Sequence, residues 1–225
     1  MCHADRIVAV SEYTKGQLIK HYGIAPDRIS VVHNGIDGTS VTRKAGAIRD
    51  KLVVFLGRIT HQKGPFLLLE TAEKVLRVYP RVKFVVAGTG DLFHDVLHSA
   101  AYRKIGSKFI FTGFLDKKKV TELLAMADVY FMPSVSEPFG LSALEAAQYR
   151  VPAVLSAQSG VAEILKSSLQ ADFWDSDKMA NYIHALLRYQ ALHCELTDGA
   201  AREANASSWD VTAEKLISIY NELIS

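Results

Sequence analysis

The chain has 225 residues, which suits one large domain or one domain with an additional fragment. Hydrophobic residues make up 49% of the sequence and charged residues 22%, as in ordinary globular proteins. A formal net charge of +2 is far from the strong basic excess of a dedicated nucleic-acid binder, so nucleic acid is not an expected partner.

The sequence also lacks the signs of a secreted or membrane-spanning protein. Cys2 and Cys194 are far apart and form no C-x-x-C pair, which argues against a disulfide framework and against a thiolate metal site. No apolar run approaches the roughly 18 residues that a membrane-spanning helix needs. Residues 1–11 lack the long apolar segment of a signal peptide. We therefore expect a cytoplasmic protein.

Short apolar runs alternate with helical patterns along the chain. A strand is expected at 6–10, a helix from Ser11 toward His21, and a second strand at 29–32, before a polar stretch at 39–50 that suits a linker. Further strands are expected at 52–56, 83–87, 109–111, 129–132, 153–155 and 171–174. Helices are expected at 65–78, 91–103, 117–126, 141–147, 161–165, 179–189 and from 209 onward. This alternation predicts an α/β fold, a Rossmann-like parallel sheet with helices on both faces.

The stretch from Ser134 to Glu145, SVSEPFGLSALE, joins an expected strand to an expected helix. Pro138 suits a first helical turn because it has no N–H group, and Gly140 lets the backbone approach a ligand closely. A strand, a glycine-bearing turn and a helix leave free backbone N–H groups at the carboxyl edge of the sheet, where an anion can bind. Two carboxylates, Glu137 and Glu145, bracket this turn.

Glu145 is the less ordinary of the two carboxylates. Its neighbours at 141–147 are apolar apart from Ser142, so the helix is expected to be buried nearly all round, and a buried carboxylate needs a partner. A sugar diol is a suitable partner, because two hydroxyl groups can donate to one carboxylate. Alternatively, Glu145 only complements the positive end of the helix. The residues alone leave both interpretations open.

Turns that carry glycine or charge follow four consecutive strands of the expected sheet. In a parallel α/β sheet, the ligand crevice lies outside the carboxyl ends of the strands. The residues at these four strand ends are Gly57-Arg58, Gly88-Thr89-Gly90, Gly113-Phe114 and Glu137. We therefore expect them to share one site at this edge.

These motifs together resemble a known family. The segment E-P-F-G-L-x-x-L-E-A, with its glutamates in an E-x7-E spacing, resembles the donor site of the retaining glycosyltransferases of family 4, which have the GT-B fold. Gly57-Arg58 followed by Lys63-Gly64 resembles the G-R-x4-K-G phosphate clamp of that family. Residues 86–90, 111–114 and 159–163 fall in the order of the family's remaining motifs. The resemblance covers the chain from about residue 4 to its C-terminus.

The resemblance implies a phosphate-binding role for two cations. Arg58 and Lys63 would straddle a diphosphate, because the arginine fork can hold two phosphate oxygens and lysine adds a compact charge. The alternative is two solvated cations on a loop, although Gly57 and Gly64 flank them.

Other residues at the same edge of the sheet would bind the sugar and the nucleoside. By the resemblance, Glu137 hydrogen-bonds hydroxyl groups of the transferred sugar and Glu145 holds the nucleotide ribose. Phe114 and Leu115 are candidates for a wall against the base. The resemblance also implies that Gly57, Gly88 and Gly90 are donor-binding residues. The backbone around Phe139, Gly140 and Leu141 would supply N–H donors to the donor's phosphate or sugar oxygens.

The implied reaction moves a sugar from a nucleotide diphosphate donor to an acceptor hydroxyl with retention at the anomeric carbon. Arg58, Lys63 and Glu137 are the expected catalytic residues, since preorganised charge can stabilise the leaving phosphate. No carboxylate pair forms an evident nucleophile–acid couple. The resemblance instead favours same-face attack assisted by the leaving phosphate, without a metal or a cofactor.

Two positions depart from the family pattern. Arg150 stands where glycine is more usual, which we expect to change only a helix-end cap. Ser159 precedes Gly160 where two glycines are common, and serine is small enough for the loop that we expect on the phosphate side.

GT-B enzymes have two Rossmann-like domains, with the acceptor half first. The resemblance therefore divides the chain into 1–38, the last β-α-β piece of an acceptor domain with its linker, 39–208, the donor-binding domain, and 209–225, a helix that crosses back. The expected partners are a nucleotide sugar donor and, through the acceptor half, a glycan or a lipid-linked glycan. A full-length form would contact a membrane peripherally, and the exposed apolar faces of this fragment favour self-association.

Two other classes of function compete with this reading. A non-catalytic nucleotide-binding module would present the same site. A zinc hydrolase could use His94 and His98 at i and i+4, but Asp95 replaces the usual Glu and no third ligand is evident, so two surface histidines are the ordinary explanation. The D-x-D sequence at 175–177 directly precedes a helix, which it is expected to cap.

Overall fold

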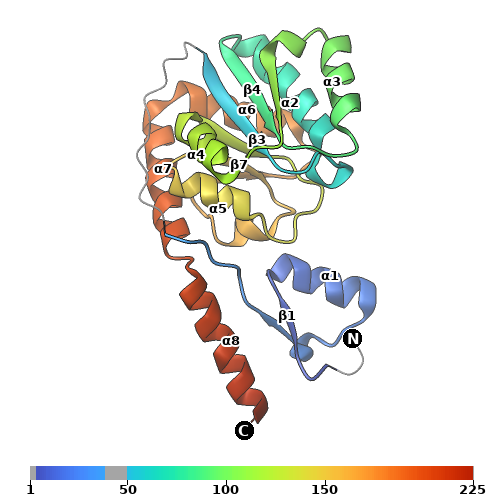
Figure 1. Ribbon diagram of the computed structural model, residues 1–225, viewed down its shortest axis with the longest axis vertical. Helices are drawn as coiled ribbons and strands as arrows, with labels where there is room; N and C mark the ends of the chain where they lie inside the picture. The colour runs from blue at the N-terminus through green and yellow to red at the C-terminus, as the bar shows by residue number, and fades with distance from the viewer. Residues whose placement is uncertain (1–3, 39–49, 225) are drawn as a thin grey trace.

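The computed structural model describes residues 4–38 and 50–224 (Figure 1). Most of these residues form a larger domain around a six-stranded parallel sheet, and a smaller lobe with a two-stranded parallel sheet lies beside it. The linker expected at 39–50 falls, except for its last residue, outside the described residues.

The strand order of the larger sheet places its carboxyl edge in the arrangement expected for ligand binding. The order is β5-β4-β3-β6-β7-β8, so the chain starts in the middle, moves to one edge and then returns to fill the other side. The order reverses between β3 and β6, and ligands of open α/β sheets bind at such a switch point. The strands are β3 (Lys51–Leu56), β4 (Val82–Ala87), β5 (Phe109–Gly113), β6 (Val129–Met132), β7 (Ala153–Ser156) and β8 (Leu169–Ala171).

Helices cover both faces of this sheet, as the alternating pattern predicts (Figure 1). Leu52 and Val54 of β3 pack into the core that includes α4, α5 and α7, whereas Val53 and Phe55 pack into the core that includes α2, α3 and α6. All four side chains are buried, which explains why the strand reads as a continuous apolar run. The helices are α2 (Pro65–Val78), α3 (Phe93–Tyr102), α4 (Lys117–Met126), α5 (Leu141–Gln148), α6 (Ser176–Arg188) and α7 (Gln190–Asn205).

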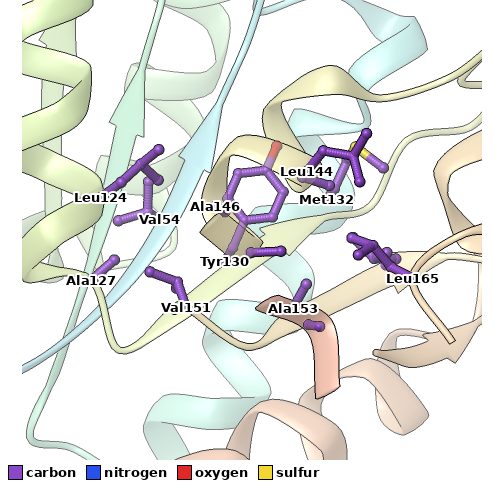
Figure 2. Packing of buried hydrophobic residues seen from close by; sticks show 14 of the residues in the cluster. Val54, Leu124, Ala127, Tyr130, Met132, Leu144, Ala146, Val151, Ala153 and Leu165 are labelled. Atoms are coloured by element: carbon purple, nitrogen blue, oxygen red, sulfur yellow. The ribbon is translucent and has the colours of Figure 1, made fainter. Parts of the chain in front are cut away.

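Helix α5 lies close to the sheet because small side chains face it. Ala143, Ala146 and Ala147 are fully buried, and Figure 2 shows Ala146 and Leu144 near the ring of Tyr130 on β6. The Tyr130 hydroxyl is 2.7 Å from Ser142 Oγ, and burial raises the pKa of this phenol well above its ordinary value. This packing fixes the first turn of α5 at the carboxyl edge of β6.

The smaller lobe consists of β1 (Ile7–Ala9), α1 (Glu12–Tyr22), the 3-10 turn η1 (Pro26–Arg28) and β2 (Ile29–Val31). The predicted helix start is confirmed, since Ser11 Oγ accepts a hydrogen bond from the N–H of Thr14. Helix α8 (Trp209–Ile224) runs from the larger domain past this lobe (Figure 1). The hydroxyl of its Thr212 donates to the carbonyl oxygen of His33, 2.9 Å away.

Two expected elements differ from the structure, and one helix was not expected. The helix expected at 161–165 is the 3-10 turn η4 (Gly160–Glu163). The strand expected at 171–174 is wrong, because β8 has already ended at Ala171 and the N–H of Phe173 donates to the side chain of Gln158. Helix α7 was not expected at all. Its polar residues hide the helical period, and Gly199 inside it is explained by close packing, since a Cβ there would lie 2.1 Å from Ser167 Oγ.

Two further short turns complete the described chain, η2 (His61–Lys63) and η3 (Gly106–Lys108). Among the helices of residues 4–38 and 50–224, none is long and apolar enough to cross a membrane.

Candidate functional site

A cleft of about 480 Å³ opens at the carboxyl edge of the sheet, between the ends of β3 and β6. This is the point at which the strand order reverses. The structure brings together here six of the residues that the sequence nominated. The cleft is lined by Leu56, Gly57, Arg58, Gln62, Lys63, Glu137, Pro138, Leu141, Ser142 and Glu145.

The turn after β3 supplies two cations to the cleft. Gly57 has a φ of +153°, and its N–H donates to the carbonyl oxygen of Ala87 on the neighbouring strand. The next residue, Arg58, is exposed, and its side chain has no hydrogen bond or ion pair with the described part of the chain. Lys63 ends the turn η2, and its aliphatic stem lies 3.7–3.8 Å from where a Cβ on Gly57 would be. Both cations are therefore held at one wall of the cleft.

Glu137 lies on the opposite wall and is paired with one of these cations. Its side chain is buried, and its carboxylate forms an ion pair with the Lys63 ammonium group. A buried carboxylate is costly unless it is paired, so this contact accounts for its charge. The backbone of Glu137 is fixed as well. Its N–H donates to Gln158 O at 2.9 Å, and its carbonyl oxygen accepts from the N–H of Gly160 at 3.0 Å.

Helix α5 begins at the floor of the cleft. Gly140 precedes it with a φ of +110°, a left-handed conformation that favours glycine, and offers no side-chain acceptor to the first helical turn. The N–H of Ala143 donates to Gly140 O at 3.0 Å, whereas those of Leu141 and Ser142 are open to an external acceptor, and the helix dipole adds partial positive charge there. Leu141 and Ser142 of this turn line the cleft. The arrangement favours an anion between the helix terminus and the two cations.

Glu145 lies one helical turn further along α5, where the expectation of a helix buried nearly all round is wrong. The helix is not buried all round: Ala143, Leu144, Ala146 and Ala147 face the core, whereas Leu141 and Glu145 are exposed. The carboxyl group is nevertheless partly shielded from water, and this desolvation raises its pKa above the ordinary 4.5, while the nearby Lys117 acts in the opposite direction. A partly shielded carboxylate at the cleft is well placed to accept hydroxyl groups.

Glu145 and Leu141 also border a second hollow, a groove of about 160 Å³ between α4, α5 and the segment at 35–37. The segment at 35–37 is tied to the helix by Gln148, whose amide donates to Asp37 O at 2.8 Å. The groove extends the cleft toward the smaller lobe.

A third hollow of about 240 Å³ joins the cleft at Leu56, Gly57 and Arg58, and it includes three more of the predicted residues, Gly88, Phe114 and Leu115. Phe114 is 79% exposed, so its ring stands at the rim with a free face.

Backbone packing explains Gly88 and Gly90. A Cβ on Gly88 would lie 2.0 Å from Gly57 O, and a Cβ on Gly90 would lie 2.4 Å from Ile59 O. These glycines let the turns after β3 and β4 approach each other. Gly90 does not line any of the three hollows, so it supports the cleft from behind.

Phe139 is placed differently from the other nominated residues. Its side chain is buried in the core on the side of α5, and its ring centroid lies 6.1 Å from that of His33. Its carbonyl oxygen accepts from the N–H of Val161 at 2.7 Å. Phe139 therefore anchors the turn rather than lining the cleft.

Sequence reasoning missed Gln62 and Ser142, which also line the cleft. Ser142 could have been found from helical spacing, since it lies three residues before Glu145 and one after Leu141. Gln62 carries no comparable signal beyond its position next to Lys63.

The loop at 159–163 is not where the sequence placed it. It does not line the cleft on the phosphate side; it packs against the smaller lobe, where the Glu163 carboxylate accepts from the N–H groups of Glu12 and Tyr13. Arg150 adopts a left-handed conformation, with a φ of +56°, at the end of α5, as expected for a cap position that usually holds glycine.

The competing metal motifs have no site in the described residues. His94 and His98 are both exposed on α3, and no group of three or more His, Cys, Asp or Glu side chains in residues 4–38 and 50–224 could hold a metal ion. Asp175 caps α6, since its carboxylate accepts from the N–H of Lys178 at 3.0 Å.

Comparison with known structures identifies the fold. The Anabaena protein HepE, solved in complex with UDP and glucose, superposes with a TM-score of 0.86 at 18% identity, over 97% of this chain and 64% of that one. Sucrose-phosphate synthase from Thermosynechococcus elongatus gives a TM-score of 0.85 at 20% identity, over 99% of this chain and 59% of that one. Both likenesses concern the fold, which is the Rossmann-like half of the GT-B architecture, as predicted.

Sequence relatives point the same way. An uncharacterized glycosyltransferase of Methanocaldococcus jannaschii is 29% identical over 96% of this chain and 59% of its own length. A D-inositol 3-phosphate glycosyltransferase of Geodermatophilus obscurus is 32% identical over 98% of this chain and 53% of its own length. The chain thus spans about half the length of the curated relatives it matches.

Family models cover nearly the whole chain. Residues 1–39 match the model described as Glycosyltransferase Family 4, and residues 41–203 match the model described as Glycosyl transferases group 1. The second match includes every residue that lines the main cleft. The chain therefore belongs to the group 1 glycosyl transferases.

Proposed function

We propose that this chain is the donor-binding part of a retaining glycosyltransferase, which moves a sugar from a nucleotide diphosphate sugar to an acceptor hydroxyl. The observation that carries the proposal is the convergence on one cleft of two cations, a free helix N-terminus and two carboxylates. Family membership and the GT-B fold support it.

In this proposal the diphosphate lies between Arg58, Lys63 and the first turn of α5. The Arg58 guanidinium group has no hydrogen-bond or ion-pair partner in the described residues and is open to solvent, so it can take phosphate oxygens without breaking another contact. Lys63 exchanges its ion pair with Glu137 for a phosphate oxygen. The released Glu137 carboxylate then accepts hydroxyl groups of the transferred sugar, which places the anomeric carbon.

The nucleoside occupies the outer part of the site. The Glu145 carboxylate accepts the two ribose hydroxyl groups, because it is partly shielded and lies one turn from the phosphate-binding end of α5. The base lies toward the rim formed by Phe114 and Leu115, where an aromatic face is free to stack.

The chemistry follows from charge. Departure of the nucleoside diphosphate builds negative charge on the leaving phosphate, and Arg58, Lys63 and the helix N-terminus are already in place to stabilise it. The leaving phosphate assists attack of the acceptor hydroxyl on the same face of the sugar, which gives retention without a metal or a cofactor.

The acceptor side belongs to the rest of the proposed enzyme. We propose that residues 1–38 and 209–225 belong structurally to an acceptor half, which presents a glycan or a lipid-linked glycan and brings the enzyme to the cytoplasmic face of a membrane. The exposed apolar side chains of α8, among them Ile217, Tyr220 and Ile224, favour self-association of this chain by itself.

The test is to measure nucleotide binding and donor consumption on one sample. Calorimetric titrations with UDP, GDP and ADP, each with and without an attached sugar, are expected to show saturable binding for at least one pair. Donor consumption with a mixed pool of glycan acceptors is expected to stay near background, because an acceptor wall is needed to orient the second substrate and exclude water. Failure of every nucleotide to bind would refute the donor role. Brisk acceptor-dependent turnover would refute the division into halves.

A non-catalytic nucleotide-binding module remains the second candidate, since its cleft would look the same. The carboxylate of Glu137 favours the transferase, because a module that only binds a nucleotide has no use for a buried carboxylate beside the phosphate-binding lysine.

A further inference from the structure

The first turn of α1 is hydrogen-bonded to the loop that carries the cleft glutamate. We define the Glu137 loop as residues 134–140. The Tyr13 hydroxyl donates to Ser136 Oγ at 3.0 Å, and the Ser11 hydroxyl donates to Pro138 O at 2.7 Å. These two contacts hold the loop immediately before and immediately after its glutamate, and both come from the smaller lobe.

The contact at Ser11 is closely packed. Ser11 is fully buried, caps α1 through the N–H of Thr14, and meets the backbone of Gly160. A Cβ on Gly160 would lie 2.5 Å from the Ser11 Cβ and 2.4 Å from Pro138 O. Glycine at 160 is therefore what allows the helix, the Glu137 loop and the turn η4 to touch.

A carboxylate from the larger domain anchors the same helix turn. Glu163 of η4 accepts from the N–H of Glu12 at 2.8 Å and of Tyr13 at 2.7 Å. These are free donors at the start of a helix, where a negative charge also complements the helix dipole. The same carboxylate lies 2.9 Å from His33 Nε2, at the exit of β2. The smaller lobe is thus fixed to the larger domain at the base of the Glu137 loop.

We propose that the first turn of α1 positions Glu137, so that Tyr13, Ser11 and Gly160 set the affinity of the cleft for the sugar portion of the donor. This inference rests on the proposed function, because it assigns the sugar contact to Glu137. The physical reason is that a carboxylate can accept sugar hydroxyl groups only at a defined place, and the loop backbone around it is fixed by another lobe. The positioning residues do not touch the diphosphate part of the site, which is built on β3 and α5.

Two variants loosen the loop in different ways. Tyr13→Phe removes only the hydroxyl group that donates to Ser136 Oγ. Gly160→Ala inserts a methyl group between α1 and the Glu137 loop. Matched controls lie on the same helix. Tyr22→Phe alters an exposed tyrosine in the last turn, and Gly16→Ala adds a Cβ that meets nothing within 4 Å.

The measurement is the ratio of the dissociation constants of a nucleoside diphosphate and its sugar conjugate, for the pairs UDP and UDP-glucose, GDP and GDP-mannose, and ADP and ADP-glucose. Tyr13→Phe and Gly160→Ala are expected to weaken the sugar conjugate by about two- to tenfold, the scale of one or two lost hydrogen bonds, and to leave the diphosphate unchanged. The controls are expected to leave both unchanged.

Amide hydrogen exchange without ligand gives an independent readout. Exchange in the Glu137 loop is expected to accelerate in both variants while the strand β4 stays protected. An unchanged affinity ratio with intact diphosphate binding overturns the inference, as does equal loss of both ligands, which would mean that α1 only holds the fold. If no pair binds the parent chain, the proposed function fails, and unchanged exchange in the loop then overturns the positioning inference separately.

Discussion

The ammonium group of Lys63 is ion-paired with the carboxylate of Glu137 across the cleft at the sheet edge. Only 17% of the lysine side chain and 9% of the glutamate side chain are exposed, so the pair is largely shielded from water. A diphosphate that binds Lys63 must therefore compete with Glu137, and Glu137 becomes available to a sugar when it does. The two proposed halves of the donor are coupled through this pair.

Glu137→Gln is expected to separate the two roles. The amide keeps the shape of the side chain but removes the charge that holds Lys63. A nucleoside diphosphate is expected to bind about three- to tenfold more tightly, the scale of one charge-assisted hydrogen bond, while the extra affinity contributed by the sugar is lost. Calorimetry with UDP and UDP-glucose, or the pair that binds best, checks both. Glu70→Gln breaks an ion pair with Lys74 on α2, away from the cleft, and serves as the control. Weaker diphosphate binding in Glu137→Gln would contradict the competition.

Arg58→Ala and Lys63→Ala are each expected to weaken a nucleoside diphosphate more than the corresponding nucleoside. Phosphate contacts are contacts between charges, so raising the salt concentration should reduce the difference between parent and variant. Lys215→Ala, which removes an exposed cation on α8, is the matched control and should have no effect. Equal losses for the nucleoside and the diphosphate would mean that these residues support the fold instead of binding phosphate.

Glu145→Ala is expected to weaken nucleotide binding by about 1.5–3 kcal/mol, the usual scale of hydrogen bonds to a charged group. The motivation is its place in the cleft next to Leu141, with a carboxyl group that is partly shielded from water. A folded variant that binds as tightly as the parent would exclude the ribose contact.

The pH dependence of binding gives a second test of Glu145. Desolvation raises its pKa above 4.5 in the free protein, and ribose hydroxyl groups favour the ionised carboxylate, so binding lowers this pKa again. Nucleotide binding should therefore release protons in the pH range over which this carboxyl group titrates, and it should weaken as the pH falls through that range. Calorimetry in two buffers of different ionisation enthalpy measures the protons released. Subtracting the values for Glu145→Gln removes the contribution of the phosphate group, and an unchanged proton release in that variant would contradict the assignment.

The glycines at the strand ends are expected to differ in their effect on stability. Gly88→Ala places a Cβ 2.0 Å from Gly57 O and should cost more than about 3 kcal/mol of unfolding free energy while it displaces the turn that carries Arg58. Gly113 also has a positive φ, of +70°, which is unfavourable for alanine, but an added Cβ there meets nothing within 4 Å. Gly113→Ala should therefore cost only about 1–2 kcal/mol of unfolding free energy. Chemical denaturation checks both, and equal costs would show that close packing of the two turns is not what requires Gly88.

The alternation of strands and helices was predictable because the capping and turn residues agree with the apolar patterns. Helices α2 and α4 and strand β6 have the bounds that the sequence indicates, since Gly64-Pro65 starts the first helix and Asp116 caps the second. The Phe173-Trp174 pair misled the prediction of the last strand because apolar residues also occur in turns. The error at α7 arose because its buried face consists of small and polar residues, such as His193, Thr197 and Ala200, instead of a regular apolar stripe.

Residues at the cleft were predictable where they follow a strand, because parallel strands end at one edge of a sheet. Arg58, Lys63 and Glu137 meet for this reason. The pairing of Lys63 with Glu137 was not expected, since its members are 74 residues apart. The exposure of Glu145 was predicted wrongly because apolar composition was taken as burial on every side, whereas helix geometry leaves Leu141 and Glu145, four residues apart, together on the outer face.

The contacts between Glu163 and the first turn of α1 could not be predicted from sequence, because 150 residues separate Tyr13 from Glu163. Ser159-Gly160 was expected in a phosphate-side loop because the family pattern has two glycines there, and the sequence gives no sign of its contact with α1. Only the three-dimensional arrangement shows that Gly160 accommodates Ser11.

A crystal structure of the chain with the nucleotide sugar that binds best would locate each group of the donor. We predict that the diphosphate lies between Arg58, Lys63 and the first turn of α5, that the ribose hydroxyl groups contact Glu145, and that Glu137 has left Lys63 for the sugar. A nucleotide bound elsewhere on the chain, or one in the cleft with Lys63 still paired to Glu137 and no contact to Glu145, would contradict it.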